Sequence, residues 1–168
     1  IQEHIQLGDV IINKASVRMD GASKNYAPVE YPGIADLETT MELKQAAADL
    51  EIPCHMGISV STDSFWPGQE RYDSFGGYVL RRLQGSMEEF RHLGCTNYEM
   101  ENATLFTVTS VLGLKAASVC GVVAQRTSGE SVAPRDVYLQ AEEKFQKIVK
   151  KMLENRSNAG ENKLEGAD

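Results

Sequence analysis

The sequence predicts an α/β domain with a largely parallel sheet that helices cover on both faces. Strand-like and helix-like segments alternate along the chain, which is typical of such domains. The strand-like segments are short and continuously apolar, as in strands buried on both sides. The length of 168 residues fits one domain, because domains usually hold about 100 to 200 residues.

The first half of the chain is expected to form a strand, a helix and a second strand. Residues 9–17 are apolar and β-branched enough for a strand. Apolar residues then recur on one helical face, at Leu37, Met41, Leu43, Ala47 and Leu50. The apolar run 54–63 predicts a buried strand that delivers the chain into the irregular stretch "FWPGQERYDSF" at 65–75.

The second half repeats this alternation. "SMEE" at 86–89 has the spacing of a capping box, in which Ser86 caps the amide of Glu89, and the helix should stop at Gly94. A strand at 95–100, a helix ending at Gly113 and a buried strand at 116–125 follow. A long final helix begins after Pro134.

The domain is expected to span residues 1–154. Residues 155–168 are polar and without pattern, which predicts a disordered tail. The chain opens at Ile1 without a methionine and runs almost directly into a strand, so we expect it to begin inside a larger gene product.

Composition narrows the classes of partner. The formal net charge of −7 argues against nucleic-acid binding, which depends on clustered Lys and Arg. No apolar run approaches the roughly 18 residues of a membrane span, so we expect no membrane association and a cytoplasmic location. The cysteines and histidines lack ligand spacing, and we expect no metal. Small molecules or protein chains fit better as partners.

Polar side chains are expected to gather where strands end. The loop 65–75, the carboxylates near 99–101 and "QRT" at 125–127 each follow a predicted strand. Ligands of α/β sheets bind outside the carboxyl ends of the strands. These stretches are therefore candidates for one binding site.

Gln69 and Arg71 are candidates for recognising a flat polar ring. Residues two apart in an extended loop project to the same side. An amide and a guanidinium there complement an O–C–NH–C–O edge such as that of uracil. The alternative is a loop amide beside a surface ion pair.

Glu99 and Glu101 flank Met100 where a strand meets a helix. A carboxylate there can accept hydrogen bonds from vicinal sugar hydroxyls, with Met100 as an apolar floor. Paired carboxylates also suggest acid–base cleavage of a glycoside. The alternative for Glu101 is an acid that complements a helix dipole. Arg126 either closes a pocket over a base or faces solvent.

Five blocks in order resemble the purine and uridine phosphorylase family, in particular its bacterial uridine-cleaving branch. They are "ASVRMDGAS" (15–23), "SFWPGQERYD" (64–73), "GSMEEF" (85–90), "NYEMENATLF" (97–106) and "GVVAQRT" (121–127). The similarity runs from about residue 1 to 152. It implies the nucleoside phosphorylase fold, a three-layer α/β/α sandwich with a mixed, barrel-like central sheet, here without its amino-terminal part.

The resemblance also implies an activity, the phosphorolysis of uridine to uracil and ribose 1-phosphate in pyrimidine salvage. Inorganic phosphate is the co-substrate, and no cofactor is expected. The positions that match Gln69 and Arg71 bind the uracil edge and stabilise the departing base, and the one that matches Phe65 packs on the base. Purine-specific relatives carry an aspartate within the block that reads "GVVAQRT" here, and its absence favours a pyrimidine.

On the sugar side, Met100 and Glu101 match residues under and beside the ribose. Glu101 would take the 2′-hydroxyl and, with Gln69 and Arg71, form the catalytic set. Glu99 and Arg126 match nearby pocket positions.

The family's phosphate-binding segments lie upstream of where this chain starts, so we expect the chain alone to be inactive. Family members complete each pocket from a neighbouring subunit, which implies a homodimer or larger. Two alternatives stay open: a non-catalytic nucleoside-binding subunit or fragment, and a nucleoside hydrolase that uses water.

Overall fold

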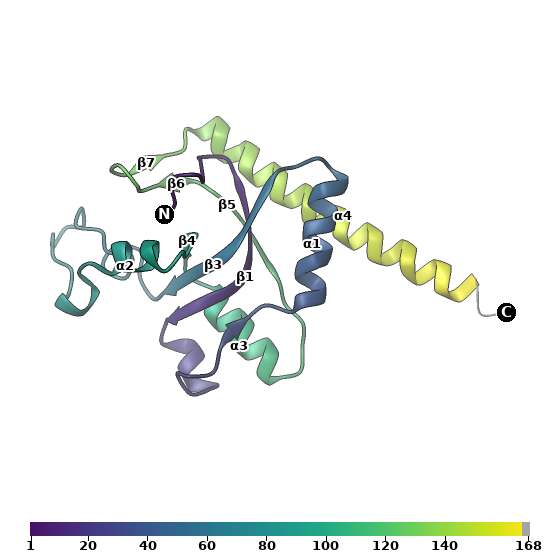
Figure 1. The fold of residues 1–168 in the computed structure, drawn as a ribbon, viewed down its shortest axis with the longest axis horizontal. Coiled ribbons are helices and arrows are strands. Elements are labelled where there is room, and N and C mark those ends of the chain that lie inside the picture. The colour runs from purple at the N-terminus through teal and green to yellow at the C-terminus, as the bar shows by residue number, and fades with distance from the viewer. Residues whose placement is uncertain (166–168) are drawn as a thin grey trace.

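The chain folds around a five-stranded mixed sheet (Figure 1). The computed structural model describes the backbone of residues 1–165 and the side chains of residues 1–159. At the centre, β1 (Val10–Met19) pairs in parallel with β3 (Cys54–Thr62), which pairs in parallel with β4 (Asn97–Glu99). The other side of β1 pairs antiparallel with β5 (Ser118–Gly121) and β2 (Gly33–Ile34).

The α/β class and the mixed sheet are confirmed, but the sheet is open and does not form a barrel. The first half of β1 pairs with β5 and its second half pairs with β2, so β5 and β2 lie along the same edge of β1. Within the described residues β4 pairs only with β3. A barrel needs a partner for every edge strand, and here neither edge reaches the other.

One face of the sheet is covered by α1 (Leu37–Asp49) and α4 (Arg135–Glu165), which also contact each other. Sequence signals set where both helices begin, since Asp36 accepts a 2.8 Å hydrogen bond from the Thr39 amide and Pro134 precedes α4. The shared core consists of Val10, Ile12, Leu43, Ala46, Ala47, Ile148 and Met152.

The helix α4 continues past residue 154, where a disordered tail was expected, and its far end projects from the body (Figure 1). Polar contacts tie this part to α1, because Asn155 donates to Asp49 at 3.0 Å and Arg156 to Thr39 at 3.0 Å. The apolar pattern gave no signal for such contacts. The residues 166–168 of the expected tail lie outside the described residues. Throughout residues 1–165 we find no helix that combines the length and the apolarity of a membrane span.

The other helices pack elsewhere on the sheet. The helix α3 (Asn102–Val111) contacts β1 and β2 and buries Phe106 completely. The short helix α2 (Ser86–His92) packs Phe90 against Val60 of β3. The predicted end of α2 at Gly94 is confirmed, since the residue has a φ of +77°.

The predicted capping box of α2 is wrong. The helix begins at Ser86 itself, and no side-chain hydrogen bond comes from its N-cap residue, Gly85. The carboxylate of Glu70 accepts instead from the amides of Gly85 (2.5 Å) and Met87 (2.8 Å). An acid from the irregular loop thus replaces the local box and ties that loop to α2.

Asp20, which follows β1, links the loop after that strand to α3. It is 2% exposed and accepts hydrogen bonds from the Ser23 amide (2.7 Å) and the Thr104 hydroxyl (2.7 Å). Burial disfavours the charged form, but the hydrogen bonds from Ser23 and Thr104 outweigh it and lower the pKa of Asp20 below its ordinary 3.8. Ionised Asp20 therefore stabilises the folded state above the unfolded pKa, and this contribution is lost as pH falls through the folded pKa.

An Asp20→Asn variant should consequently lose less stability on acidification than the wild type. The check is urea unfolding of both proteins at pH 7 and pH 3. Equal losses in the two proteins would show that Asp20 contributes nothing to the acid sensitivity.

Candidate functional site

A cavity of about 310 Å³ is lined by β4, by the loop that follows β3 and by residues 120–126, which begin in β5. All the predicted site residues line it: Phe65, Gln69, Arg71, Glu99, Met100, Glu101 and Arg126. The loop 65–75 and the carboxylates do follow parallel strands, as expected. The third stretch follows β5, which is antiparallel to β1, and it reaches the cavity through the hairpin of β6 (Ala124–Gln125) and β7 (Ser131–Val132).

The loop after β3 is held in a tight turn that places Gln69 beside Arg71. The Gly68 amide donates to the Ser64 hydroxyl at 3.0 Å, and the Arg71 amide donates to the Trp66 carbonyl at 2.7 Å. A Cβ at Gly68 would lie 2.6 Å from the Ser64 carbonyl oxygen, so only glycine fits there. Both Gln69 and Arg71 are 5% exposed, and Arg71 Nη1 donates to Gln69 Oε1.

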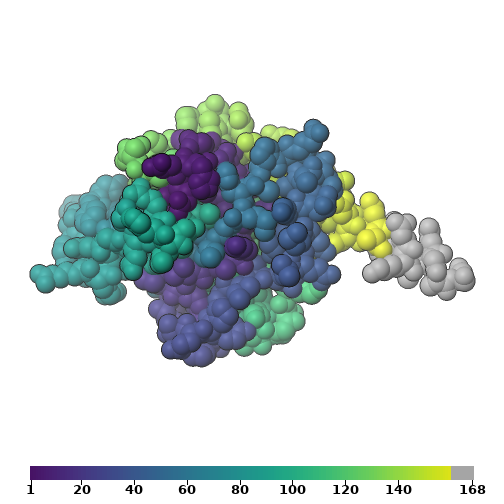
Figure 2. Space-filling view, viewed as in Figure 1, coloured from purple at the N-terminus to yellow at the C-terminus, as the bar shows by residue number. Residues whose placement is uncertain are grey.

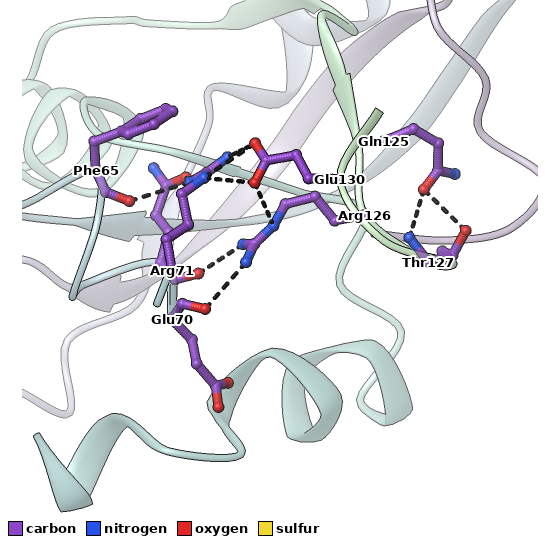
Figure 3. A network of polar contacts seen from close by, with 8 residues as sticks. Phe65, Glu70, Arg71, Gln125, Arg126, Thr127 and Glu130 are labelled. Carbon is purple, nitrogen blue, oxygen red and sulfur yellow. Dashed lines mark hydrogen bonds and ion pairs between the residues drawn. The ribbon is translucent and has the colours of Figure 1, made fainter. Parts of the chain in front are cut away.

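The guanidinium of Arg71 is fixed on every side (Figure 3). Its Nη1 donates to the Phe65 carbonyl at 3.1 Å, and its Cζ lies 3.8 Å from the centroid of the Phe65 ring. Its Nε and Nη2 donate to the carboxylate of Glu130 at 3.1 Å and 3.0 Å. A stacked and forked guanidinium of this kind has little freedom to rotate.

Arg126 and Glu130 face each other across the β6–β7 hairpin. Gln125 pairs with Ser131, and Gly129 adopts a φ of +98° in the turn between them. Arg126 Nε lies 3.6 Å from Glu130 Oε2. The hairpin therefore places the guanidinium of Arg126 and the carboxylate of Glu130 side by side, next to the loop 65–71.

Arg126 also holds the backbone of that loop. Its Nη1 and Nη2 donate to the carbonyls of Gln69 (2.6 Å) and Glu70 (3.1 Å). Burial and the neighbouring charge of Arg71 lower the pKa of Arg126, and the carboxylate of Glu130 opposes this. Since arginine stays protonated in proteins, two guanidinium groups lie at this end of the cavity, and the nearby carboxylates of Glu130 and Glu70 offset their charge.

Glu99 lines the cavity, but protein donors surround its carboxylate. Serine hydroxyls from β1 and β3 donate to Oε1, at 3.2 Å from Ser16, 2.9 Å from Ser59 and from Ser61. The amides of Glu101 (2.7 Å) and Asn102 (2.6 Å) donate to Oε2. Glu99 thus fastens the start of α3 to the sheet and accepts from its first amides. Glu101 lies at the N-cap position of α3, where an acid can complement the helix dipole as considered from the sequence.

Glu101, in contrast, keeps its carboxylate available. It is exposed, and within the described part of the chain it accepts only from the Met100 amide, at 3.1 Å. Met100 is 37% exposed and lies against the same cavity. A carboxylate with free acceptor positions beside an apolar side chain can accept hydrogen bonds from the hydroxyl groups of a sugar ring.

The sequence did not reveal Glu130 or Glu70 as members of the site. Both act through partners distant in sequence, at separations of 59 residues for Glu130 with Arg71 and 17 for Glu70 with Met87. One local signal for Glu130 existed, since Ser128 and Gly129 mark a turn that brings residue 130 back beside Arg126.

An α/β sheet that carries a mostly apolar cavity with a few grouped polar side chains is typical of proteins that bind small molecules. Residues 1–154 match the family model described as the phosphorylase superfamily. The chain belongs to this superfamily.

Curated relatives agree with this family. The chain is 47% identical to the uridine phosphorylase of Escherichia coli (strain K12) over 149 residues, which are 89% of this chain and 58% of that protein. It is 42% identical to the uridine phosphorylase of Thermococcus kodakarensis over 162 residues, 95% of this chain and 58% of that protein. A guanosine phosphorylase of Halorubrum lacusprofundi is 28% identical over 129 residues, 77% of this chain and 48% of that protein. The chain thus spans 58% of the length of these uridine phosphorylases.

Proposed function

We propose that the protein catalyses the phosphorolysis of uridine to uracil and ribose 1-phosphate, a step of pyrimidine nucleoside salvage. The observation that carries the proposal is the buried Gln69–Arg71 pair in one cavity with the available carboxylate of Glu101. The similarity to uridine phosphorylases supports it. Inorganic phosphate is the co-substrate, and the chemistry needs no further cofactor.

The Gln69–Arg71 pair suits the edge of uracil. Since Arg71 donates to Oε1 of Gln69, the orientation of the amide is fixed. The amide NH₂ can then donate to a carbonyl of the base, and the second lone pair of Oε1 can accept its N–H. The ring of Phe65, which is 44% exposed, offers a flat apolar surface for the base.

Cleavage of the N-glycosidic bond moves its electron pair to the base and leaves positive charge on the ribose. Donors already oriented at the base stabilise the first charge without reorganisation, and they act more strongly in the transition state than in the ground state. Glu101 accepts the 2′-hydroxyl and places its negative charge near the sugar. Phosphate then attacks, so no covalent enzyme nucleophile is required.

The remaining predicted residues support this geometry. Met100 lies under the ribose, and Arg126 holds the backbone of the loop that carries Gln69. Glu99 orients Met100 and Glu101 by fixing the start of α3. The stretch from Gly121 to Thr127 contains no acid to protonate a purine, which favours a pyrimidine.

Exposed apolar side chains support self-association, and we propose a homodimer or larger assembly in the cytoplasm. Leu37 is 76% exposed, Leu112 62% and Leu114 60%. Leu37 and Leu114 line one hollow of about 460 Å³. Large apolar groups grouped in this way are typical of contact surfaces.

The decisive experiment measures uracil released from uridine by the full-length protein with and without phosphate. We expect release only with phosphate, matched by ribose 1-phosphate, and none from adenosine. Release of uracil and free ribose without phosphate would identify a hydrolase. Binding of uridine without release under either condition would leave a non-catalytic role.

A further inference from the structure

We propose that Glu130 is a positioning residue for the departing base, because it orients Arg71 and Arg126 as one unit. This proposal rests on the proposed function. Glu130 is absent from the lining of the 310 Å³ cavity, and it lines a second cavity of about 450 Å³ on the other side of Arg71 and Arg126. Its carboxylate therefore acts on the base through these arginines and not by contact.

The contacts of Arg71 show how the orientation is set. Both oxygens of Glu130 accept from Nε at 3.1 Å, and Oε1 also accepts from Nη2 at 3.0 Å. The Nε–Nη2 edge of the guanidinium is thereby occupied by Glu130 (Figure 3). The Nη1 corner is left toward Gln69, which lines the cavity. A forked contact of this kind fixes direction as well as distance.

Burial makes this arrangement sensitive to the loss of Glu130. The side chains of Arg71 and Arg126 are 4% and 10% exposed, so water screens their charges poorly. The carboxylate of Glu130 lies between them, 3.0 Å from Arg71 Nη2 and 3.6 Å from Arg126 Nε. Without it, the two neighbouring guanidinium groups would repel each other and lose the one carboxylate that pairs with both of them.

Arg126 extends the effect of Glu130 to Gln69, the second residue proposed to bind the base. It donates to the carbonyls of Gln69 and Glu70, so a shift of Arg126 releases the backbone of the loop. The Glu130 carboxylate, in the loop between β6 and β7, thus sets the orientation of Arg71 directly and the position of Gln69 through Arg126.

The role predicts a particular dependence on the leaving group. If the polar groups at the base are displaced, the cleavage rate falls most for a base that cannot stabilise its own negative charge. A base with a more acidic N–H depends less on these groups, and 5-fluorouracil is such a base compared with uracil. Partial unfolding, in contrast, lowers the rates with both nucleosides by the same factor.

The test compares uridine with 5-fluorouridine in single-turnover cleavage by the full-length protein at saturating phosphate. Glu130→Gln is expected to slow uridine cleavage about 10- to 100-fold and 5-fluorouridine cleavage clearly less. The matched control is Glu42→Gln, which breaks an Arg–Glu pair with Arg156 on α1 and α4. It should leave both rates unchanged.

Equal slowing of both nucleosides by Glu130→Gln, or no slowing, would overturn the proposal. If Glu130→Gln does not fold, Glu130→Asp keeps the charge but not the reach, and it should show the same difference between substrates. Wild-type rates in Glu130→Asp would then overturn positioning. A wild-type protein that fails to cleave uridine with phosphate refutes the proposed function instead.

Discussion

Replacing Arg71 by alanine is expected to lower kcat/KM for uridine phosphorolysis by about 10²- to 10³-fold, as the loss of an oriented donor does in other active sites. Arg71 contacts the Gln69 amide, the Phe65 carbonyl and ring, and the carboxylate of Glu130. Its removal takes a positive charge from beside the departing base and frees the Gln69 amide to turn. The measurement is steady-state uracil release in the full-length protein.

Two further variants sharpen the result. Arg71→Lys should stay close to the alanine variant, because an ammonium cannot fork to Glu130 and reach Gln69 together. Arg156→Ala removes an arginine that is paired with Glu42 away from the cavity, and it should retain wild-type activity. An Arg71→Ala protein within about threefold of wild type would contradict the role assigned to this guanidinium.

The neighbouring acids Glu99 and Glu101 should separate stability from activity. Glu99→Ala leaves buried serine hydroxyls and the first amides of α3 without their acceptor. We expect a loss of about 2–4 kcal/mol in the free energy of unfolding, since unsatisfied buried donors cost about 1–3 kcal/mol each and relaxation recovers part of this. Urea unfolding measures the loss.

Glu101→Ala is the matched comparison. Its carboxylate is exposed and accepts from one amide, so the stability should change by no more than about 0.5 kcal/mol. Uridine cleavage should nevertheless fall, because the acceptor for the 2′-hydroxyl is gone. The opposite pattern, with a stable Glu99→Ala and an unstable Glu101→Ala, would reverse the roles given to these acids.

Local signals predicted much of the fold and the wall of the cavity. Gly94 and Gly113 both lie beyond helix ends at positive φ, and Pro134 directly precedes α4. The side chains of Gln69 and Arg71 lie together as predicted. They meet in a tight turn with Glu70 at a φ of +54°, and not in the extended loop that the two-residue spacing assumed. Such features depend on neighbours in sequence, and the sequence is sufficient for them.

Features that depend on distant partners were not predictable in this way. Glu99 looked like a free site acid, but serines of two other strands occupy its carboxylate. The apparent capping box at Ser86 was replaced by Glu70, a residue from an earlier loop. In both cases the pairing is decided by tertiary packing, which residue spacing does not encode.

Glu70 separates the Gln69–Arg71 pair from the long loop that follows it. Its φ of +54° turns the backbone between Gln69 and Arg71, and its carboxylate holds the amides of Gly85 and Met87. The segment 72–84, which projects from the body in Figure 2, is therefore a side loop fastened at its base. Because the fastening lies outside that segment, changes at its exposed residues should leave the Gln69–Arg71 geometry unchanged, whereas Val79 is completely buried and ties the segment to the body.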